Sequence, residues 1–124
     1  MNKTYHVKKN TEIEAILKNK CFKNNKYFSV YKKENSETIH FRYALSVGKK
    51  IGNAVIRNSV KRRIRAILEE LPIEREKNND IFIIAKKSIL DLSYQQTKEQ
   101  LEFLLNKLKI TKEKNNWDIS LIDI

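Results

Sequence analysis

The stretch KKIGNAVIRNSVKRRIR, residues 49–65, contains seven Lys and Arg residues and no Asp or Glu. Apolar residues nevertheless recur through it and the following turns with the spacing of an α-helix. On a helical wheel they fall within about 120° of one another, the usual width of a core-facing stripe; they are Ile56, Val60, Ile64, Ile67, Leu68 and Leu71. The pattern predicts a helix that begins after a capping residue, Asn53, and is stopped by Pro72.

The cations of this helix form a ridge beside the apolar stripe. Arg57, Lys61 and Arg65 recur every four residues, with Asn58 and Arg62 next to them. Four residues of helix rise about 6 Å, which is similar to the spacing of consecutive phosphates on a nucleic-acid strand. Like charges at this spacing repel, and no acidic residue from 49 to 68 offsets them. A solvated basic face is the alternative, but the missing carboxylates favour an external polyanion. The free N–H groups at the start of the helix, after Gly52, also favour phosphate.

The charge of the whole chain supports the same interpretation. The 124 residues carry a formal net charge of +11. Residues 1–65 contain 17 Lys and Arg against four Asp and Glu, whereas residues 66–124 contain nine against eleven. We therefore expect a single domain that binds nucleic acid through its first half.

Periodicity predicts the other elements. Thr11 and Glu14 fit a capping box for a short helix ending near residue 20. Residues 26–33 and 38–47 alternate apolar and polar side chains and predict two strands. The turn-forming ENSE between them predicts an antiparallel hairpin.

The second half of the chain predicts a strand and a helix. The run IFIIA, residues 81–85, is apolar on both faces, which is typical of a central strand covered by helices. Ser93 and Gln96 fit a second capping box, for a helix that reaches about residue 109. The tail beyond this helix contains four large apolar residues, Trp117, Ile119, Leu121 and Ile122. They suit either docking of the tail on the folded body or pairing as a short strand.

No catalytic or metal-binding cluster is evident from the sequence. His6 and His40 are far apart and have no metal-ligand spacing, so a metal site is not expected. The single cysteine, Cys21, excludes an intramolecular disulfide and is expected to be a buried thiol. No apolar stretch has the length of a membrane span or a signal sequence, so we expect a cytoplasmic protein.

The segment LSVGKKIGNAVIRNSVKRRIR, residues 45–65, resembles the signature of the bacterial ribonuclease P protein subunit. The resemblance extends from Lys8-Lys9-Asn10 through FSVY and IIAKK to YQQTK, and we expect a ribonuclease P domain over residues 1–109 with a tail at 110–124. It implies an α+β fold in which a mainly antiparallel sheet packs with about three helices. It also implies a left-handed βαβ crossover and an RNA-binding fold like that of ribosomal proteins.

The resemblance also implies a function. In the family the RNA subunit hydrolyses the bond at the 5′ end of mature tRNA and requires Mg²⁺, while the protein subunit has no catalytic residue and holds no cofactor or metal of its own. The expected partners are ribonuclease P RNA and the 5′ leader of precursor tRNA, with neither DNA nor membrane. The residues expected to bind the RNA subunit are Lys49, Lys50, Asn53, Arg57, Asn58, Lys61, Arg62 and Arg65. Those expected to bind the leader are Ile13, Leu17, Phe28, Tyr31, Ser46, Arg57 and Lys61.

Two departures from the family pattern affect these expectations. Ser59 stands where the family's Arg-Asn-Arg motif has its second arginine. Ile13 and Leu17 stand where many relatives carry aromatic residues, so core packing is an equal alternative for both.

Three other classes of function remain to be distinguished. A structural RNA-binding protein of the ribosomal or assembly type would need the same charge but no leader groove. A DNA-binding regulator would need a second helix joined by a short turn before the basic helix, which the sequence lacks. A stand-alone protein nuclease would need a catalytic cluster.

Overall fold

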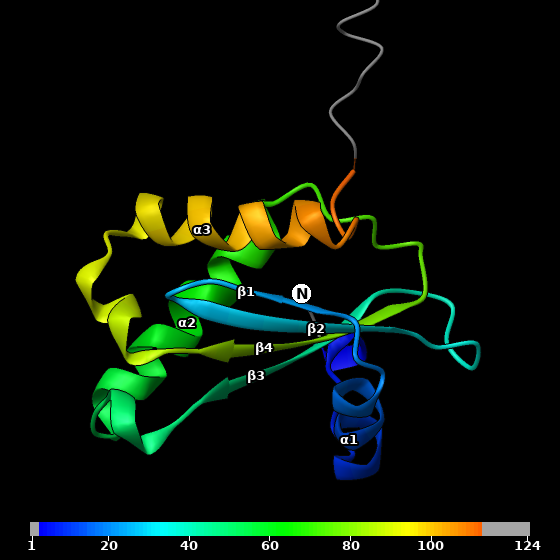
Figure 1. Cartoon of the computed structure of the whole chain (residues 1–124), viewed down its shortest axis with the longest axis horizontal. Coiled ribbons are helices and arrows are strands. Elements are labelled where there is room, and N and C mark those ends of the chain that lie inside the picture. Colours follow the sequence, from blue (N-terminus) through cyan, green and yellow to red (C-terminus); the bar gives the residue numbers. More distant parts are fainter. Residues whose placement is uncertain (1–2, 113–124) are drawn as a thin grey trace, which may run out of the picture.

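The computed structural model describes residues 3–112, which form one four-stranded sheet with three α-helices (Figure 1). The helices are α1 (Asn10–Lys18), α2 (Ala54–Glu70) and α3 (Tyr94–Lys107). The strands are β1 (Phe22–Asn24), β2 (Phe28–Glu34), β3 (Arg42–Val47) and β4 (Asn79–Ala85). There are also three short 3-10 turns: η1 (Lys3–Tyr5), η2 (Lys49–Ile51) and η3 (Lys87–Asp91). Among residues 3–112, none of the helices has the length and apolar character needed to cross a membrane.

The sheet is mixed, with strand order β1-β2-β4-β3. The expected hairpin between residues 26–33 and 38–47 is wrong, because β4 lies between β2 and β3. β4 pairs antiparallel with β2 and parallel with β3. As expected of its apolar sequence, β4 is paired on both sides near the centre of the sheet, and all of its residues except Phe82 and Ile84 are buried.

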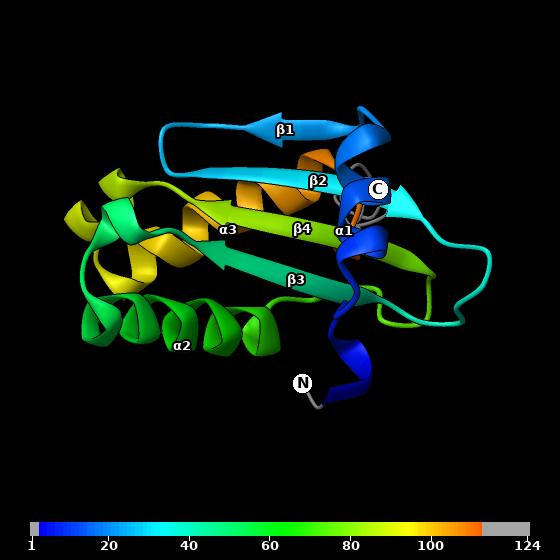
Figure 2. The same cartoon turned by 90° about the horizontal axis from the view of Figure 1, so that it is seen from below.

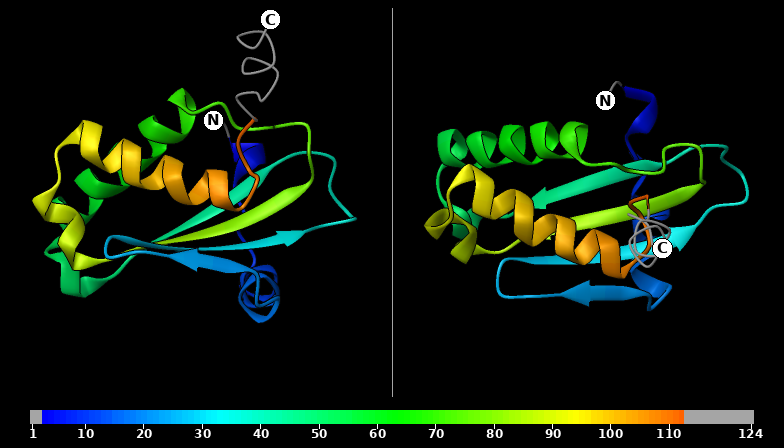
Figure 3. Two further views of the ribbon diagram at one scale, coloured as in Figure 1. Left: turned by 45° about the horizontal axis from the view of Figure 1, so that its top comes forward. Right: turned by 90° about the horizontal axis from the view of Figure 1, so that it is seen from above.

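The connection from β3 through α2 to the parallel strand β4 is the left-handed crossover that the resemblance implies. In the right-hand view of Figure 3, β3 and β4 run towards the left, α3 lies in front of the sheet, and the chain passes from β3 by way of α2 down to β4. This hand is opposite to that of nearly all such connections. The basic helix is thereby placed along the β3 edge of the sheet (Figure 2).

The two faces of the sheet are covered differently. α2 and α3 lie on one face and enclose the main core, whereas α1 crosses the other face near one end (Figures 1 and 2). A small second cluster, Val7, Ile16 and Ala44, seats α1 on the sheet. Beyond α1, this second face is not covered by any other helix of the described chain.

Helix α2 forms largely as predicted. The side chain of Asn53 accepts a hydrogen bond from the Ile56 N–H at 3.0 Å, and the helix ends at Glu70, two residues before Pro72. The predicted stripe is buried except for Ile56, which is 38% exposed in the first turn. Ile56 folds back over Gly52, where an added Cβ would lie only 3.0 Å from it, so packing within the chain accounts for the glycine.

The two predicted capping boxes have different outcomes. At α3 the Ser93 hydroxyl and the Gln96 side chain bond each other's backbone N–H, as predicted. At α1 the box is wrong, because the helix begins at Asn10, which places Thr11 inside the first turn; the capping position is Lys9, whose side chain makes no capping bond. The predicted burial of Cys21 is also wrong: its thiol is exposed just before the edge strand β1.

A buried ion network fixes α1 against the sheet. Arg42 on β3 donates to both carboxylate oxygens of Asp80 on β4, at 3.0 and 2.7 Å, and to Glu12 of α1 at 2.6 Å. The side chain of Asp80 is only 3% exposed and also accepts from Asn35 at 3.0 Å. Hydrogen bonding to Asp80 is the main reason that the pKa of Arg42 is raised above its ordinary value, so Arg42 stays charged.

The folded body extends slightly beyond the expected boundary at residue 109. Ile110 is fully buried, and Thr111 forms an isolated antiparallel bridge with Ile73. The apolar tail residues from Trp117 onward lie outside the described residues.

Candidate nucleic-acid interface

The residues of η2 and α2 that are predicted to bind the RNA subunit form a basic surface. Two of these residues, Arg57 and Lys61, are half-buried. The others are exposed: Lys49, Lys50, Asn53, Asn58, Arg62 and Arg65. Within residues 3–112, no carboxylate forms a salt bridge with any of these cations. Asn53 serves as the helix cap, and Arg65 lines the same hollow as the uncharged Tyr43. The surface therefore presents uncompensated positive charge.

Two arginines of α2 differ from the rest. Arg63 points to the flank opposite the basic surface and donates to the backbone carbonyl of Leu92 at 3.2 Å, which ties α2 to the start of α3. The Nε of Arg57 is buried but has no hydrogen-bond acceptor in the part of the chain that the structure describes. This N–H group is thus positioned by packing and not by an internal acceptor.

Two rows of side chains cross the strands on the sheet face that carries α1; the first row packs against the small cluster under α1, and the second lies beyond it. The register places Ala44, Phe82 and Tyr31 in one row and Ser46, Ile84 and Ser29 in the next. Tyr31 and Ser46 therefore share this face, as the predicted alternation of the two strands requires, and both are half-buried. We call this surface, bounded by α1 and by the basic side of α2, the groove.

A hollow of about 210 Å³ joins α1, β3 and α2 at one end of the groove. Ile13 of α1 and Ala44 of β3 form apolar parts of its lining, and Lys61 and Arg65 contribute positive charge. The hollow thus brings together residues that are about 50 positions apart in the sequence. Its combination of apolar wall and cations suits a base or sugar with its phosphate.

Sequence reasoning missed His6 and Tyr43, which also line this hollow. The Tyr43 hydroxyl and the His6 Nε2 are hydrogen-bonded at 3.0 Å. Burial and the positive charges of Arg65 and Lys8 lower the pKa of His6, while burial raises the pKa of Tyr43. His6 is therefore neutral near pH 7. No sequence spacing could have shown the pair, because it depends on the bridge between His6 and Tyr43 in the folded sheet.

The remaining predicted leader residues do not all lie on the groove face. Leu17 on α1 is 36% exposed, and Ile13 is half-buried against the small cluster under α1. Phe28 is fully buried on the opposite face of the sheet, in the main core, so it does not belong to the groove. Sequence reasoning also missed Phe22, whose ring stacks on Tyr31 with centroids 5.1 Å apart.

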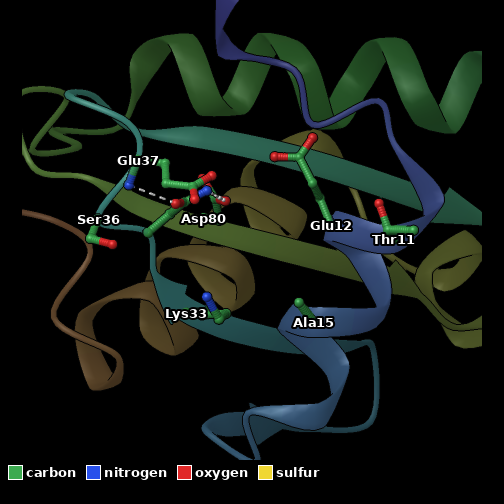
Figure 4. Close-up of a pocket in the computed structure, with 8 residues that line it drawn as sticks. Thr11, Glu12, Ala15, Lys33, Ser36, Glu37 and Asp80 are labelled. Atoms are coloured by element: carbon green, nitrogen blue, oxygen red, sulfur yellow. Dashed lines mark hydrogen bonds between the residues drawn. The ribbon is translucent and has the colours of Figure 1, made fainter.

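A second hollow on this side of the sheet is polar and acidic. It lies between α1 and the loop after β2 and is lined by Glu12, Lys33, Glu37 and Asp80, among others (Figure 4). Glu12 and Asp80 are already bound by Arg42. Because carboxylates repel phosphate, this hollow is not part of the nucleic-acid interface.

Comparisons with known proteins show which family the chain resembles. The family model described as Ribonuclease P matches residues 1–109. The chain is 41% identical to the ribonuclease P protein component of Ligilactobacillus salivarius, over 91% of this chain and all of the relative. It is 43% identical to that of Enterococcus faecalis, over 89% of this chain and 93% of the relative.

This chain belongs to the ribonuclease P protein family.

Solved structures of the family have the same fold. A mutant of the Staphylococcus aureus RNase P protein superposes with a TM-score of 0.80 at 37% identity, covering 87% of this chain and 91% of that one. A further structure of the Staphylococcus aureus protein gives a TM-score of 0.72 at 35% identity, covering 94% and 98%. The ribonuclease P fold, with its mixed four-stranded sheet and three helices, is therefore confirmed, and the chain is a protein component of ribonuclease P.

In residues 3–112, no three His, Cys, Asp or Glu side chains gather where they could bind a metal ion. What this part of the chain offers a ligand is the cations of the basic surface and the side chains of the groove.

Proposed function

We propose that this chain binds ribonuclease P RNA through the basic surface of α2 and holds the single-stranded 5′ leader of precursor tRNA in the groove. The RNA subunit performs the hydrolysis and binds the Mg²⁺ that the reaction needs. The observation that carries the proposal is the hollow where Lys61 and Arg65 of α2 meet Ile13 of α1 beside the open sheet face.

The basic surface supports the first half of the proposal. Its cations extend from η2 along α2 and have no carboxylate partners among the described residues. Phosphates of the RNA subunit would neutralise this charge and release counterions. The protein then lowers the Mg²⁺ concentration at which the ribozyme folds and works.

The groove supports the second half. A single strand is bound by cations that follow its backbone and by side chains on which unpaired bases stack. The groove offers Lys61 and Arg65 for the first purpose and Tyr31 for the second, and Ser46 adds a hydroxyl that can bond sugar or phosphate. Mature tRNA has no leader, so the groove favours precursor over product.

The salt dependence of RNA binding tests the basic surface. Lys61→Ala is expected to weaken binding and to flatten the plot of log K against log salt by about 0.7–0.9 for each phosphate that the protein no longer neutralises. Lys98→Ala is the matched control, because Lys98 lies on α3 and is paired with Glu70. A slope that Lys61→Ala leaves unchanged removes Lys61 from the interface.

A comparison of precursor with mature tRNA tests the groove. Tyr31→Ala is expected to weaken precursor binding by about 1–3 kcal/mol, the contribution of one stacked base, and to leave mature tRNA binding unchanged. Equal losses for both ligands contradict the groove assignment. If the protein binds RNA but neither substrate preference nor cleavage depends on it, its role is that of a structural RNA-binding protein.

A further inference from the structure

Phe22 occupies an unusual position for a large apolar side chain. It is 44% exposed on β1, a three-residue edge strand whose residues are all exposed. It belongs to neither of the two buried apolar clusters. Edge strands commonly carry charged residues that discourage further pairing. An exposed phenylalanine on such a strand therefore indicates a binding partner.

The ring of Phe22 lies against Tyr31. The two residues are direct partners in the register between β1 and β2, and their rings stack at 5.1 Å with planes 25° apart. Because directly paired residues project to the same side of a sheet, Phe22 lies on the groove face with Tyr31. Phe22 therefore lies against the Tyr31 ring while 44% of its own surface stays exposed.

The surroundings identify the kind of ligand. Lys18 and Lys20 are exposed and flank the turn that leads from α1 to β1. An exposed ring next to cations, in continuity with a phosphate-binding groove, matches a single-stranded nucleic-acid surface. A protein partner would be expected to bury an apolar patch, whereas Cys21, Lys23 and Asn24 around Phe22 are polar or small and exposed.

We propose that Phe22 is a base-stacking residue of the leader site: one unpaired base of the 5′ leader stacks on its outer face, and Tyr31 supports the ring from behind. This proposal rests on the proposed function of the groove. It extends the leader path from α2 across the sheet to the edge strand β1. It also gives this chain an aromatic stacking surface from β1, where α1 provides only the aliphatic side chains of Ile13 and Leu17.

The test uses holoenzyme assembled from the full chain and a bacterial ribonuclease P RNA. Phe22→Leu keeps an apolar side chain over Tyr31 but removes the aromatic ring. It therefore separates base stacking from apolar shielding of Tyr31. The matched control is Phe103→Leu, since Phe103 is a 55% exposed phenylalanine on α3, on the other side of the sheet. Thermal unfolding of each variant shows whether the fold is kept, and Phe22→Trp is a second variant that restores a ring.

The expected result is a loss of precursor affinity of roughly 5- to 100-fold for Phe22→Leu, with no change for mature tRNA. Phe22→Trp should restore affinity, and Phe103→Leu should match the unsubstituted protein. A second measurement uses precursors that carry 2-aminopurine at single leader positions. At one of these positions the unsubstituted protein should quench the fluorescence of the base, and Phe22→Leu should not. The losses from Phe22→Leu and Tyr31→Ala should not add, because the two rings form one stack.

Two negative results can be told apart. If the unsubstituted holoenzyme prefers precursor to mature tRNA but Phe22→Leu binds both as well as before, Phe22 is only a cover for the sheet edge and the inference is overturned. If the unsubstituted holoenzyme shows no preference for precursor, the groove itself does not bind the leader, and the proposed function fails together with the inference.

Discussion

Replacement of Arg42 by Met should strongly destabilise the fold, because it leaves a buried carboxylate without its cation. Asp80 is 3% exposed and receives two hydrogen bonds from Arg42, and Glu12 receives a third. Removal of one partner from a buried ion pair costs about 3–5 kcal/mol. Asn35 still donates to Asp80 at 3.0 Å, which places the expected loss near the lower end, about 3 kcal/mol.

Urea unfolding measures this loss directly. With a typical m-value for a small domain, a loss of about 3 kcal/mol lowers the midpoint by roughly 1–3 M. Arg75→Met is the matched control: its salt bridge to Glu69 joins side chains that are 37% and 44% exposed, and its loss should cost about 1 kcal/mol or less. Asp80→Asn added to Arg42→Met should recover part of the stability, because it removes the unpaired charge. Equal effects of Arg42→Met and Arg75→Met would refute the reasoning.

Further predictions concern helix caps and pH. Ser93→Ala should lower the free energy of unfolding by about 0.5–2 kcal/mol, whereas Thr11→Ala should change it little because Thr11 does not cap α1; urea midpoints compare the two. The pKa of His6 in the folded state is lowered below 6.5, so the unfolded chain binds the proton more readily than the folded chain. The contribution of His6 to stability is therefore present above pH 6.5 and is lost as the pH falls through the lowered pKa. His6→Gln should therefore reduce the loss of stability between pH 7 and pH 5, and an unchanged pH profile would contradict this assignment. A phosphate bound at Arg65 should raise the pKa of His6, so precursor binding should tighten as the pH falls towards 6 in the unsubstituted protein and less so in His6→Gln.

The basic helix was the most predictable part of the molecule. Its cap, its end and most of its buried stripe follow from local rules that act within one helix, and only Ile56 was misplaced. The strand alternation of residues 28–31 and 42–47 was likewise predictable, since it put Tyr31 and Ser46 on one face. Such features depend on neighbours in the sequence.

Strand pairing was less predictable, because it depends on the whole chain. Proximity in sequence favoured a hairpin between β2 and β3, but β4, the most apolar strand, takes the central place between them. The left-handed crossover came from the family resemblance alone, since general rules favour the opposite hand.

The site was predictable only in part for the same reason. The cations of α2 were identified from their spacing, but the two aromatic contacts that the sheet creates were not. His6 contacts Tyr43 through an isolated bridge to β3, and Phe22 contacts Tyr31 across the pairing of β1 with β2; no local pattern reveals either contact. Phe28 was placed in the groove because of its position in the family motif, although its alternation with Tyr31 puts it in the core.

The most direct test of the central claim is cleavage of a 5′-extended precursor tRNA at low Mg²⁺, with bacterial ribonuclease P RNA present or absent and this protein added or withheld. We predict cleavage at the mature 5′ end that requires the RNA and is strongly enhanced by the protein. A rate that the protein leaves unchanged, although it binds the RNA, would contradict the proposed role of the groove and the basic surface.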